Sequence, residues 1–424
     1  MRFLENTKAK IYKYLRLSEK YIKTDMVYLA KGGSWLMFGQ TASSILSFLL
    51  AVAFANMLTK ETYGIYKYIL SLTGILGIFT LTGMGTAIIQ ATGRGFEGSL
   101  KTALKTEIKW GLLAGLSSII LAGYYYINNN IILAISFLIA AVFLPLTDTF
   151  TIYDSYLTGK KLFKNSIKYK TIGQFISVIF LILTLYLTKN IFLILLAYFI
   201  PLVGLNFIFL KIIISKFKPN KNIDPQTISY GKHVSLNNVM GVISAQMDKI
   251  LIFHYLSVTD LAIYIFATAI PEQVKKLSGS LAVLVFPKFS ERSIKEIKSG
   301  IKNKFLILFV FGLLITGAYI LIAPFIYNIF FPQYKDSIFY SQIFSLSMLN
   351  IFSMPASVFL SAKKKIKEQY LINVMQFVFQ ITAMFIFILW QGLLGLIIAR
   401  VLTRFFGNLI NMIFYYRVVA RDTE

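Results

Sequence analysis

The chain is dominated by long hydrophobic stretches that short polar segments separate. Most stretches reach about 20 residues, the length that an α-helix needs to cross the hydrocarbon core of a bilayer. The pattern predicts spans at residues 34–57, 64–91, 106–127, 131–153, 170–188, 190–215, 233–256, 261–287, 304–326, 337–361, 367–389 and 391–416. The predicted fold is therefore an all-α integral membrane protein with about twelve transmembrane helices.

The composition agrees with a membrane protein. Of the 424 residues 57% are hydrophobic and 14% are charged, whereas soluble domains carry about 25% charged residues. The chain has no cysteine, which excludes disulfides and thiolate chemistry. Its two histidines, His233 and His254, lie at opposite ends of one predicted span, so we expect no metal site and no bound cofactor.

Lysine and arginine alternate along the connections between the predicted spans. The segment before the first span holds eight of them, and alternate connections from 92–109 onward hold four to six each. The intervening connections hold only Lys60, Lys189 and Lys335. The positive-inside rule then predicts that both termini are cytoplasmic. The net charge of +25 is thereby assigned to membrane topology, and we expect no nucleic-acid partner.

A short internal repeat predicts two halves. Residues 59–66 resemble residues 258–264, which aligns Tyr66 with Tyr264, 198 residues later. Parallel repeats of six helices place substrate sites between the halves. The predicted organisation is a basic segment 1–31, an N-lobe 32–215, a cytoplasmic linker 216–232 and a C-lobe 233–424. The segment 1–31 fits either an amphipathic helix on the membrane surface or a partly ordered basic tail.

Charged residues inside the predicted spans are the candidate functional residues, because each costs roughly 2.5–3.5 kcal/mol at mid-bilayer. The cations are Lys249, Lys275, Lys276, Arg400 and Arg404, and the acids are Asp148, Asp248 and Glu272. Glu272, Lys275 and Lys276 share one helical face, and Arg400 and Arg404 share another. The excess of cations favours a cavity that holds an anionic group such as a diphosphate. The acids would then tune the site or bind a coupling cation.

Other interpretations of these charges stay open. They could pair with one another between helices and fix the bundle, and Lys275 or Lys276 could reach an interface. Amides such as Asn237, Gln246, Gln376, Gln380, Asn408 and Asn411 could line a sugar path or join helices. Pro271 is the predicted hinge, because a proline bends a helix and this one precedes Glu272.

Several short motifs carry a resemblance to a known family. They are Lys31-Gly-Gly-Ser34, Tyr63-Gly-Ile-Tyr66, Gly83-Met-Gly-Thr-Ala87, Gly93-Arg-Gly95, Gln246-Met-Asp-Lys-Ile-Leu251, Ala262-Ile-Tyr264, Val285-Phe-Pro-Lys-Phe-Ser290, Gly392-Leu-Leu-Gly395 and Arg400-Val-Leu-Thr-Arg404. Over essentially its whole length the chain resembles the Wzx-type polysaccharide and O-antigen flippases of the multidrug/oligosaccharidyl-lipid/polysaccharide (MOP) exporter superfamily. Ala262 departs from the family's glycine, and the pair Lys275–Lys276 matches no family motif.

The resemblance implies a V-shaped bundle of two six-helix lobes, like that of MATE transporters. It also implies transport of undecaprenyl-pyrophosphate-linked oligosaccharide units across the bacterial inner membrane by alternating access, with no reaction catalysed. H⁺, Na⁺ or the membrane potential could drive transport. A polysaccharide polymerase and a chain-length regulator are candidate partners, and the chain is long enough to work as a monomer.

Two other functions compete with the flippase. A cation-coupled multidrug or small-molecule exporter of the same superfamily would favour an acid-dominated pocket, and the excess of cations argues against it. A membrane glycosyltransferase or polysaccharide polymerase would need a sizeable extramembrane loop, and every predicted connection is short. The chain also lacks a P-loop, which argues against ATP hydrolysis.

Overall fold

The computed structural model describes residues 26–291, 294–363 and 365–421. Within these residues the chain is helical and contains no β-strand. The helices of the first half are α2 (Met26–Met57), α3 (Lys60–Leu76), η1 (Gly77–Thr80), α4 (Met84–Gly93), α5 (Ser99–Ile127), α6 (Ile131–Thr147), η2 (Thr149–Thr151), α7 (Ile152–Gly159), α8 (Phe163–Leu187) and α9 (Ile191–Phe217).

The second half is also helical. Its helices are α10 (Thr227–Tyr255), α11 (Val258–Glu291), α12 (Ile294–Phe330), η3 (Pro332–Tyr334), α13 (Ser337–Ser345), η4 (Leu346–Ser353), α14 (Met354–Ala362) and α15 (Ile366–Arg421). The long α15 is two helices, because Gln391 and Gly392 leave the helical conformation. Gly392 has φ +56° and ψ −129°, a conformation that a residue without a Cβ adopts most easily.

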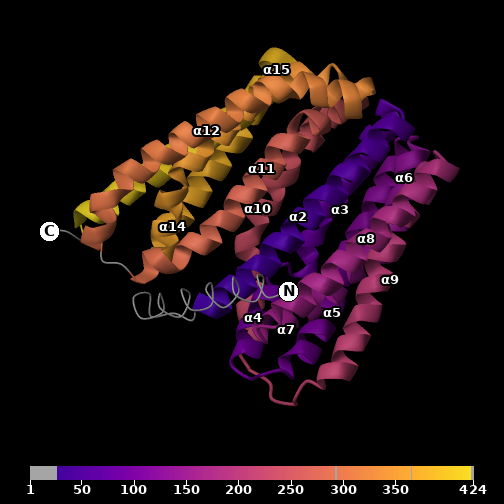
Figure 1. The fold of residues 1–424 in the computed structure, drawn as a ribbon. Coiled ribbons are helices and arrows are strands. Elements are labelled where there is room, and N and C mark those ends of the chain that lie inside the picture. Colours follow the sequence, from indigo (N-terminus) through magenta and orange to yellow (C-terminus); the bar gives the residue numbers. More distant parts are fainter. Residues whose placement is uncertain (1–25, 292–293, 364, 422–424) are drawn as a thin grey trace, which may run out of the picture.

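The two halves form two lobes arranged as a V (Figure 1). In the first lobe α5 packs along α6, and α8 packs between α2 and α9. In the second lobe α12 packs on η4, and α14 and α10 pack on α15. The lobes meet where α3 contacts α10 and α11 and where α4 contacts α10. The predicted two-lobed bundle of a MATE-like fold is confirmed.

Several helices break within the bundle. The helices Lys60–Thr80 and Met84–Gly93 are bent by 47° relative to each other. The fourth predicted span is interrupted by η2, four residues after Pro145, and the tenth by η4. Proline removes a backbone donor, and membranes tolerate irregular backbone only where protein or a cavity surrounds it. These breaks are therefore the places where backbone atoms become available to a site.

Basic connections gather at one end of the bundle, here named the charged end and defined by the connections 94–98, 160–162 and 218–226. Arg94 pairs with Asp224 there, and the N–H of Gly98 donates to the carbonyl of Asn222 at 2.9 Å. At the opposite end Lys60 Nζ lies 2.7 Å from Asp336. The alternation of charge predicted from the sequence thus corresponds to two ends of the bundle, and a cytoplasmic charged end stays a prediction.

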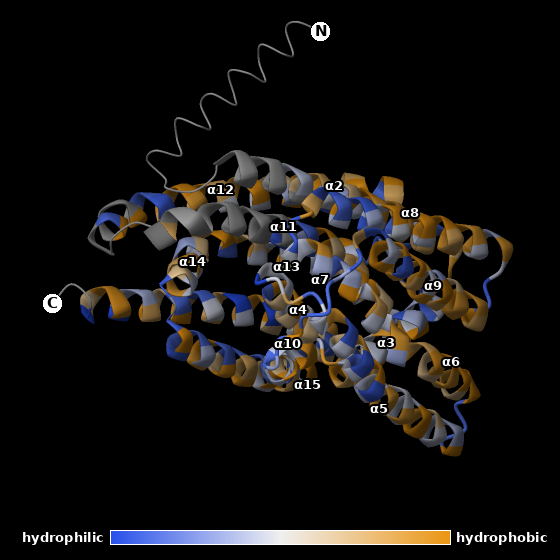
Figure 2. Ribbon diagram, turned by 90° about the horizontal axis from the view of Figure 1, so that it is seen from below, coloured by the Kyte–Doolittle hydropathy of each residue, from blue (hydrophilic) through white to orange (hydrophobic). Residues whose placement is uncertain are grey.

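The predicted spans coincide with helices or broken helices in the described part of the chain. Eight helices are long and apolar enough to cross a membrane, or nine if the bent pair counts as one span. One of these is α15, which the break at Gly392 divides, and α10 and α11 are not among them. Figure 2 shows α6 and α9 as mostly hydrophobic, in agreement with a multi-pass membrane protein.

Two predicted segments lie outside the lobes, the basic segment 1–31 and the linker 216–232. Residues 1–25 lie outside the described residues, so the two interpretations of the basic segment stay predictions. From Met26 onward the chain is helical and continues into the first span. The predicted linker 216–232 is helical at both of its ends, because α9 runs to Phe217 and α10 starts at Thr227.

Candidate functional site

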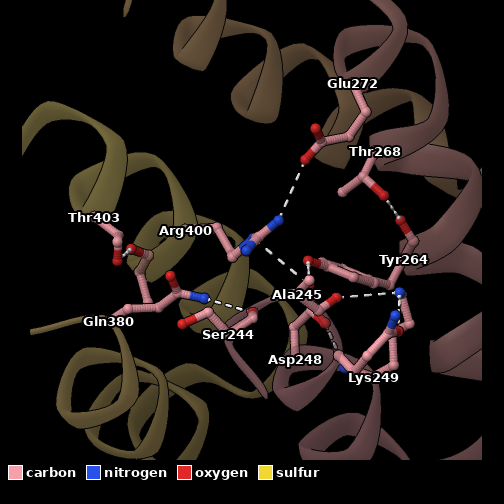
Figure 3. Close-up of polar contacts among 12 residues, drawn as sticks. Ser244, Ala245, Asp248, Lys249, Tyr264, Thr268, Glu272, Gln380, Arg400 and Thr403 are labelled. Carbon is pink, nitrogen blue, oxygen red and sulfur yellow. Dashed lines mark hydrogen bonds and ion pairs between the residues drawn. The ribbon is translucent and has the colours of Figure 1, made fainter. Parts of the chain in front are cut away.

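The acids and arginines of the second lobe converge on one cluster, here named the C-lobe charge cluster and made of Asp248, Glu272, Arg400 and Arg404. Asp248 of α10 is 2% exposed. Its carboxylate accepts a hydrogen bond from the hydroxyl of Tyr264 at 2.6 Å and lies 3.5 Å from Arg400 Nε. Figure 3 shows Arg400 between Asp248 and Glu272.

Glu272 of α11 bridges the two arginines of α15. Its Oε1 lies 3.2 Å from Arg400 Nη2 and also accepts a hydrogen bond from Arg404 Nη2. One carboxylate can meet both guanidinium groups because Arg400 and Arg404 are one turn apart on the same face. The cluster therefore ties α10 and α11 to α15, as the ion-pair interpretation predicts.

Arg404 extends the cluster toward η4. Its Nη1 donates to Ser347 Oγ at 2.6 Å, and its guanidinium lies 4.7 Å from the centroid of the Phe344 ring. The Arg404 side chain is 9% exposed. A guanidinium has five donors, so it can hold Glu272 and Ser347 and still present donors to a ligand.

The lysines predicted with the cluster take different positions. Lys275 is exposed and lines a cavity of 290 Å³ together with Arg404. Lys249 points along its own helix, because its Nζ donates to Gln246 Oε1 at 2.7 Å and to the carbonyl of Ala245 at 3.3 Å. The side chain of Lys276 lies outside the described residues. The backbone N–H of Lys249 donates to Asp248 Oδ1 at 2.8 Å, but the Lys249 ammonium group is directed to Gln246 and Ala245.

The cavity beside Arg404, here named the small cavity, is rich in polar side chains. Besides Lys275 and Arg404 its wall includes Ser347, Asn350, Ser353, Ser357, Gln376, Asn408 and Asn411. Asn408 donates to Asn350, and Ser353 donates to Asn408 Oδ1 at 2.5 Å. These groups and the two cations form a concave surface suited to an anion with several oxygen atoms.

A larger cavity of 1200 Å³ lies between α10, the start of α15 and Gly74 and Thr82 of the first lobe. We name it the large cavity. Seven amide side chains line it: Asn237, Asn238, Gln246, Gln369, Asn373, Gln376 and Gln380. No Asp, Glu, Lys or Arg is among the lining residues of the described chain. Gln376 belongs to the walls of both cavities, so the two are adjacent.

Asp148 does not join the cluster, because it belongs to the first lobe, where it follows α6. Its Oδ2 lies 2.5 Å from the hydroxyl of Thr80. Glu107 of α5 is another buried acid of this lobe, and its Oε2 has no hydrogen-bond partner in the described part of the chain. Sequence analysis does not select Glu107 as a candidate, because the residue lies at the boundary of a predicted span near Lys105 and Lys109.

Pro271, the predicted hinge, is buried, and α11 remains α-helical across it from Val258 to Glu291. A bend there during transport stays a prediction. Tyr264 and Ser347 are partners of the cluster that the sequence does not single out as such. Of these two residues, only Tyr264 belongs to a sequence pattern noted above, the internal repeat.

Comparisons with known proteins identify the family of this chain. The profile of the family described as polysaccharide biosynthesis protein matches residues 29–293. An uncharacterized membrane protein of Methanocaldococcus jannaschii is 23% identical over 357 residues, which are 75% of this chain and 70% of that protein. The profile covers more than half of the chain and so determines its family.

Solved structures share the fold at low sequence identity. An inward-facing MATE multidrug resistance transporter of the MOP superfamily superposes with a TM-score of 0.71 at 12% identity, covering 89% of this chain and 95% of the other. An outward-facing structure gives 0.60 at 11% identity, covering 93% and 96%. A MOP superfamily transporter from Pyrococcus furiosus, whose binding pocket is described as having reverse polarity, gives 0.58 at 12% identity, covering 94% and 96%.

The family profile, the two-lobed fold and the apolar helices agree. The chain belongs to the polysaccharide biosynthesis protein family, and it is a multi-pass membrane protein with a MATE-like fold.

Proposed function

We propose that this transporter is a flippase for lipid-linked oligosaccharides, with the sugars in the large cavity and the phosphate groups in the small cavity. The observation that carries the proposal is the adjacency of the two cavities. One wall is neutral and rich in amides, the other contains Lys275 and Arg404, and Gln376 belongs to both. A sugar joined to a phosphate has the same two parts side by side.

The large cavity has the chemistry that a sugar requires. Each Asn or Gln side chain offers two N–H donors and a carbonyl acceptor, which matches hydroxyl groups that both donate and accept. Ligand pockets for drug-sized molecules measure about 300–1,000 Å³, and this cavity measures 1200 Å³. Tyr370 and Phe377 add aromatic surface. These features support a ligand that is large, polar and uncharged over most of its length.

The small cavity suits the phosphate end of the same ligand. Arginine and lysine bind phosphate oxygens through charge-assisted hydrogen bonds. The C-lobe charge cluster and Lys275 together carry three cations and two anions, a net charge of +1. A positive net charge in a surrounding of low dielectric constant attracts an anion strongly. Binding of a pyrophosphate in particular is part of the proposal.

The competing functions have less support. A pocket for cationic drugs would favour acidic residues, and the large cavity has none among its described lining residues. A glycosyltransferase or polymerase is a weaker alternative, since family and fold point to a transporter.

We further infer that the membrane is the bacterial inner membrane, with both termini and the charged end in the cytoplasm. The higher TM-score with the inward-facing MATE structure supports a cavity that faces the cytoplasm in this conformation. An undecaprenyl carrier, a monomeric transporter, and a polymerase and chain-length regulator as partners belong to the same proposal. Coupling to H⁺, to Na⁺ or to the membrane potential belongs to the same proposal.

The test is transport in proteoliposomes of a fluorescent undecaprenyl-pyrophosphate oligosaccharide. Lys275→Ala removes a cation of the small cavity, and Asn373→Ala removes an amide of the large cavity. Because one charge-assisted hydrogen bond contributes about 1.5–3 kcal/mol, we expect Lys275→Ala to raise the apparent KM about tenfold or more. Lys189→Ala, in an exposed connection at the opposite end, is the matched control.

Two outcomes would contradict the proposal. If the wild type moves no lipid-linked sugar and instead exports an organic cation down an ion gradient, the drug-exporter function replaces the flippase. If the wild type moves the lipid and both variants match the control, the ligand binds elsewhere in the bundle.

A further inference from the structure

Two aromatic residues of α15 belong to the wall of the large cavity. Tyr370 is 55% exposed and Phe377 is half-buried. Another ring of the same helix is packed, because Phe379 stacks on Phe406 with 4.0 Å between the ring centroids. Within the described part of the chain, neither Tyr370 nor Phe377 packs against a second aromatic ring. These two rings are therefore available to a ligand in the cavity.

Helical spacing places the two rings on one face of α15. Tyr370 and Phe377 are seven residues, or two helical turns, apart, which separates them by about 10 Å along the axis. Asn373 lies between them, is exposed and also lines the cavity. Gln369 and Gln376, the neighbours of the two rings in sequence, line it as well. This wall therefore alternates aromatic surface with amide groups.

A chain of neutral sugars has the complementary surface. A pyranose ring carries apolar C–H groups on its faces and hydroxyl groups around its edge. The face of an aromatic ring carries a partial negative charge, which attracts C–H groups, and an amide both donates and accepts hydrogen bonds. Asn237 and Asn238 add amides on the wall that α10 forms. Since no charged residue is among the described lining residues, a ligand at this wall needs no charge of its own.

The position of the small cavity orders the sugars along this wall. Gln376 lines both cavities, and Phe377 is the next residue. Tyr370 lies two turns nearer to the start of α15 at Ile366. With the phosphate groups in the small cavity, the sugar beside Phe377 is the first one, and the following sugars extend toward Tyr370. About 10 Å along the helix is the length of two sugar units in an extended chain, so the third sugar reaches Tyr370.

We propose that Phe377 and Tyr370 are stacking subsites for the first and third sugars of the transported oligosaccharide, with the second sugar beside Asn373. The numbering of the sugars rests on the proposed function, whereas stacking on the two rings does not. The substrate class is then an oligosaccharide of at least three neutral pyranoses whose hydroxyl groups are mainly equatorial, because an axial hydroxyl stands on the face that would meet the ring.

Contact with lipid is the competing explanation of exposed aromatic rings in a membrane protein. Phe325 of α12, which is 68% exposed and lines neither cavity, suits such a contact. Lipid chains are apolar and offer an amide no hydrogen bond, whereas Tyr370 and Phe377 are flanked by amides. The surroundings of these two rings therefore favour a sugar over a lipid chain.

The experiment is a binding titration of the full-length protein with fluorescent undecaprenyl pyrophosphate that carries no sugar or one, two or three β-linked glucose residues. We expect a gain in affinity of about three- to tenfold from the first sugar and again from the third, as one aromatic contact provides. Phe377→Ala should abolish the gain from the first sugar, and Tyr370→Ala only the gain from the third. Tyr370→Phe should retain both gains, because the ring and not the hydroxyl makes the contact. Phe325→Ala is the matched control and should leave every affinity unchanged.

The possible results separate this proposal from the proposed function. If the sugar-free lipid binds the wild type as tightly as the glycosylated lipids, or if Phe377→Ala and Tyr370→Ala weaken all the probes equally, the subsites are wrong. If the gains behave as expected but proteoliposomes move no lipid-linked sugar, the subsites stand and the proposed function fails. If the wild type moves the lipid and neither variant alters the gains, the flippase stands and the stacking subsites are overturned.

Discussion

Acids within the predicted spans have different partners in the two lobes. In the second lobe Asp248 and Glu272 each meet an arginine. In the first lobe Asp148 accepts a hydrogen bond from the hydroxyl of Thr80, and Glu107 Oε2 has no hydrogen-bond partner in the described part of the chain. A buried ion pair holds its charges permanently, because breaking it leaves an uncompensated charge. The comparison indicates acids held by arginines in one lobe and acids without a described ion pair in the other.

The difference also bears on the anion binding proposed for the second lobe, which would need no conformational change of its charges. Glu272 holds both Arg400 and Arg404 in place, so their side-chain entropy is already lost before a ligand arrives. The ion-pair and the cavity interpretations of these residues are then compatible. The acids position the arginines, and Arg404 keeps donors that face the small cavity.

The largest effect should come from removing the bridging acid. Loss of one partner of a buried ion pair costs about 3–5 kcal/mol; since the Glu272 side chain is 28% exposed, we expect Glu272→Gln to lower the free energy of unfolding by about 3 kcal/mol. Glu107→Gln, the matched change in the other lobe, should cost no more than about 1 kcal/mol. Denaturant unfolding in detergent measures both. Equal losses of unfolding free energy in the two variants would mean that the buried acids of the two lobes contribute equally to stability.

A double mutant tests whether Glu272 acts through the arginine. Arg404→Gln added to Glu272→Gln removes the unpaired charge that the single variant leaves behind. Coupled neighbours show interaction energies of about 0.5–3 kcal/mol, and we expect about 2 kcal/mol of recovery relative to the sum of the single losses. The same unfolding measurement applies, with Lys189→Gln in place of Arg404→Gln as the control. Strict additivity would show that Glu272 and Arg404 are independent.

The sequence predicts the spans and the charged residues that share one face of a helix, because both depend only on local periodicity. Glu272 with Lys275, and Arg400 with Arg404, follow from helical spacing alone. Which acid meets which arginine could not, since it depends on the rotation of α10, α11 and α15 about their axes. A one-residue shift turns a side chain by about 100°, more than any hydropathy window resolves.

Other residues of the candidate sites could not be predicted from the sequence, for different reasons. Glu107 lies among lysines at the edge of a span, where a pattern of charge suggests a connection. The amides of the large cavity are scattered over α10 and α15, and each amide alone is as typical of a helix–helix contact. Only the packing of α10 on α15 brings them together, and no local pattern encodes that packing.

A smaller effect should follow from removing the hydroxyl that holds Arg404. Ser347 is 3% exposed, and its Oγ accepts from Arg404 Nη1 at 2.6 Å. A hydrogen bond to a charged group contributes about 1.5–3 kcal/mol. Because Glu272 still holds Arg404, we expect Ser347→Ala to cost about 1.5 kcal/mol. The control is Ser257→Ala, which removes an exposed hydroxyl that binds Asp260. An equal loss of unfolding free energy in the control would show that the hydrogen bond to Arg404 contributes no more than an exposed one.

The smallest effect should come from an ion pair in water at the end opposite the charged end. Lys60 of α3 and Asp336 lie 2.7 Å apart and join the two lobes, but the Asp336 side chain is 65% exposed. Exposed pairs contribute about 0.2–1 kcal/mol, because water screens the charges and two long side chains lose entropy. Lys60→Ala should therefore leave the unfolding free energy almost unchanged, at low salt and at high salt alike. The same charges thus have large or small effects according to burial. A loss from Lys60→Ala as large as that from Glu272→Gln would mean that contact between the lobes, and not burial, determines the contribution of an ion pair in this protein.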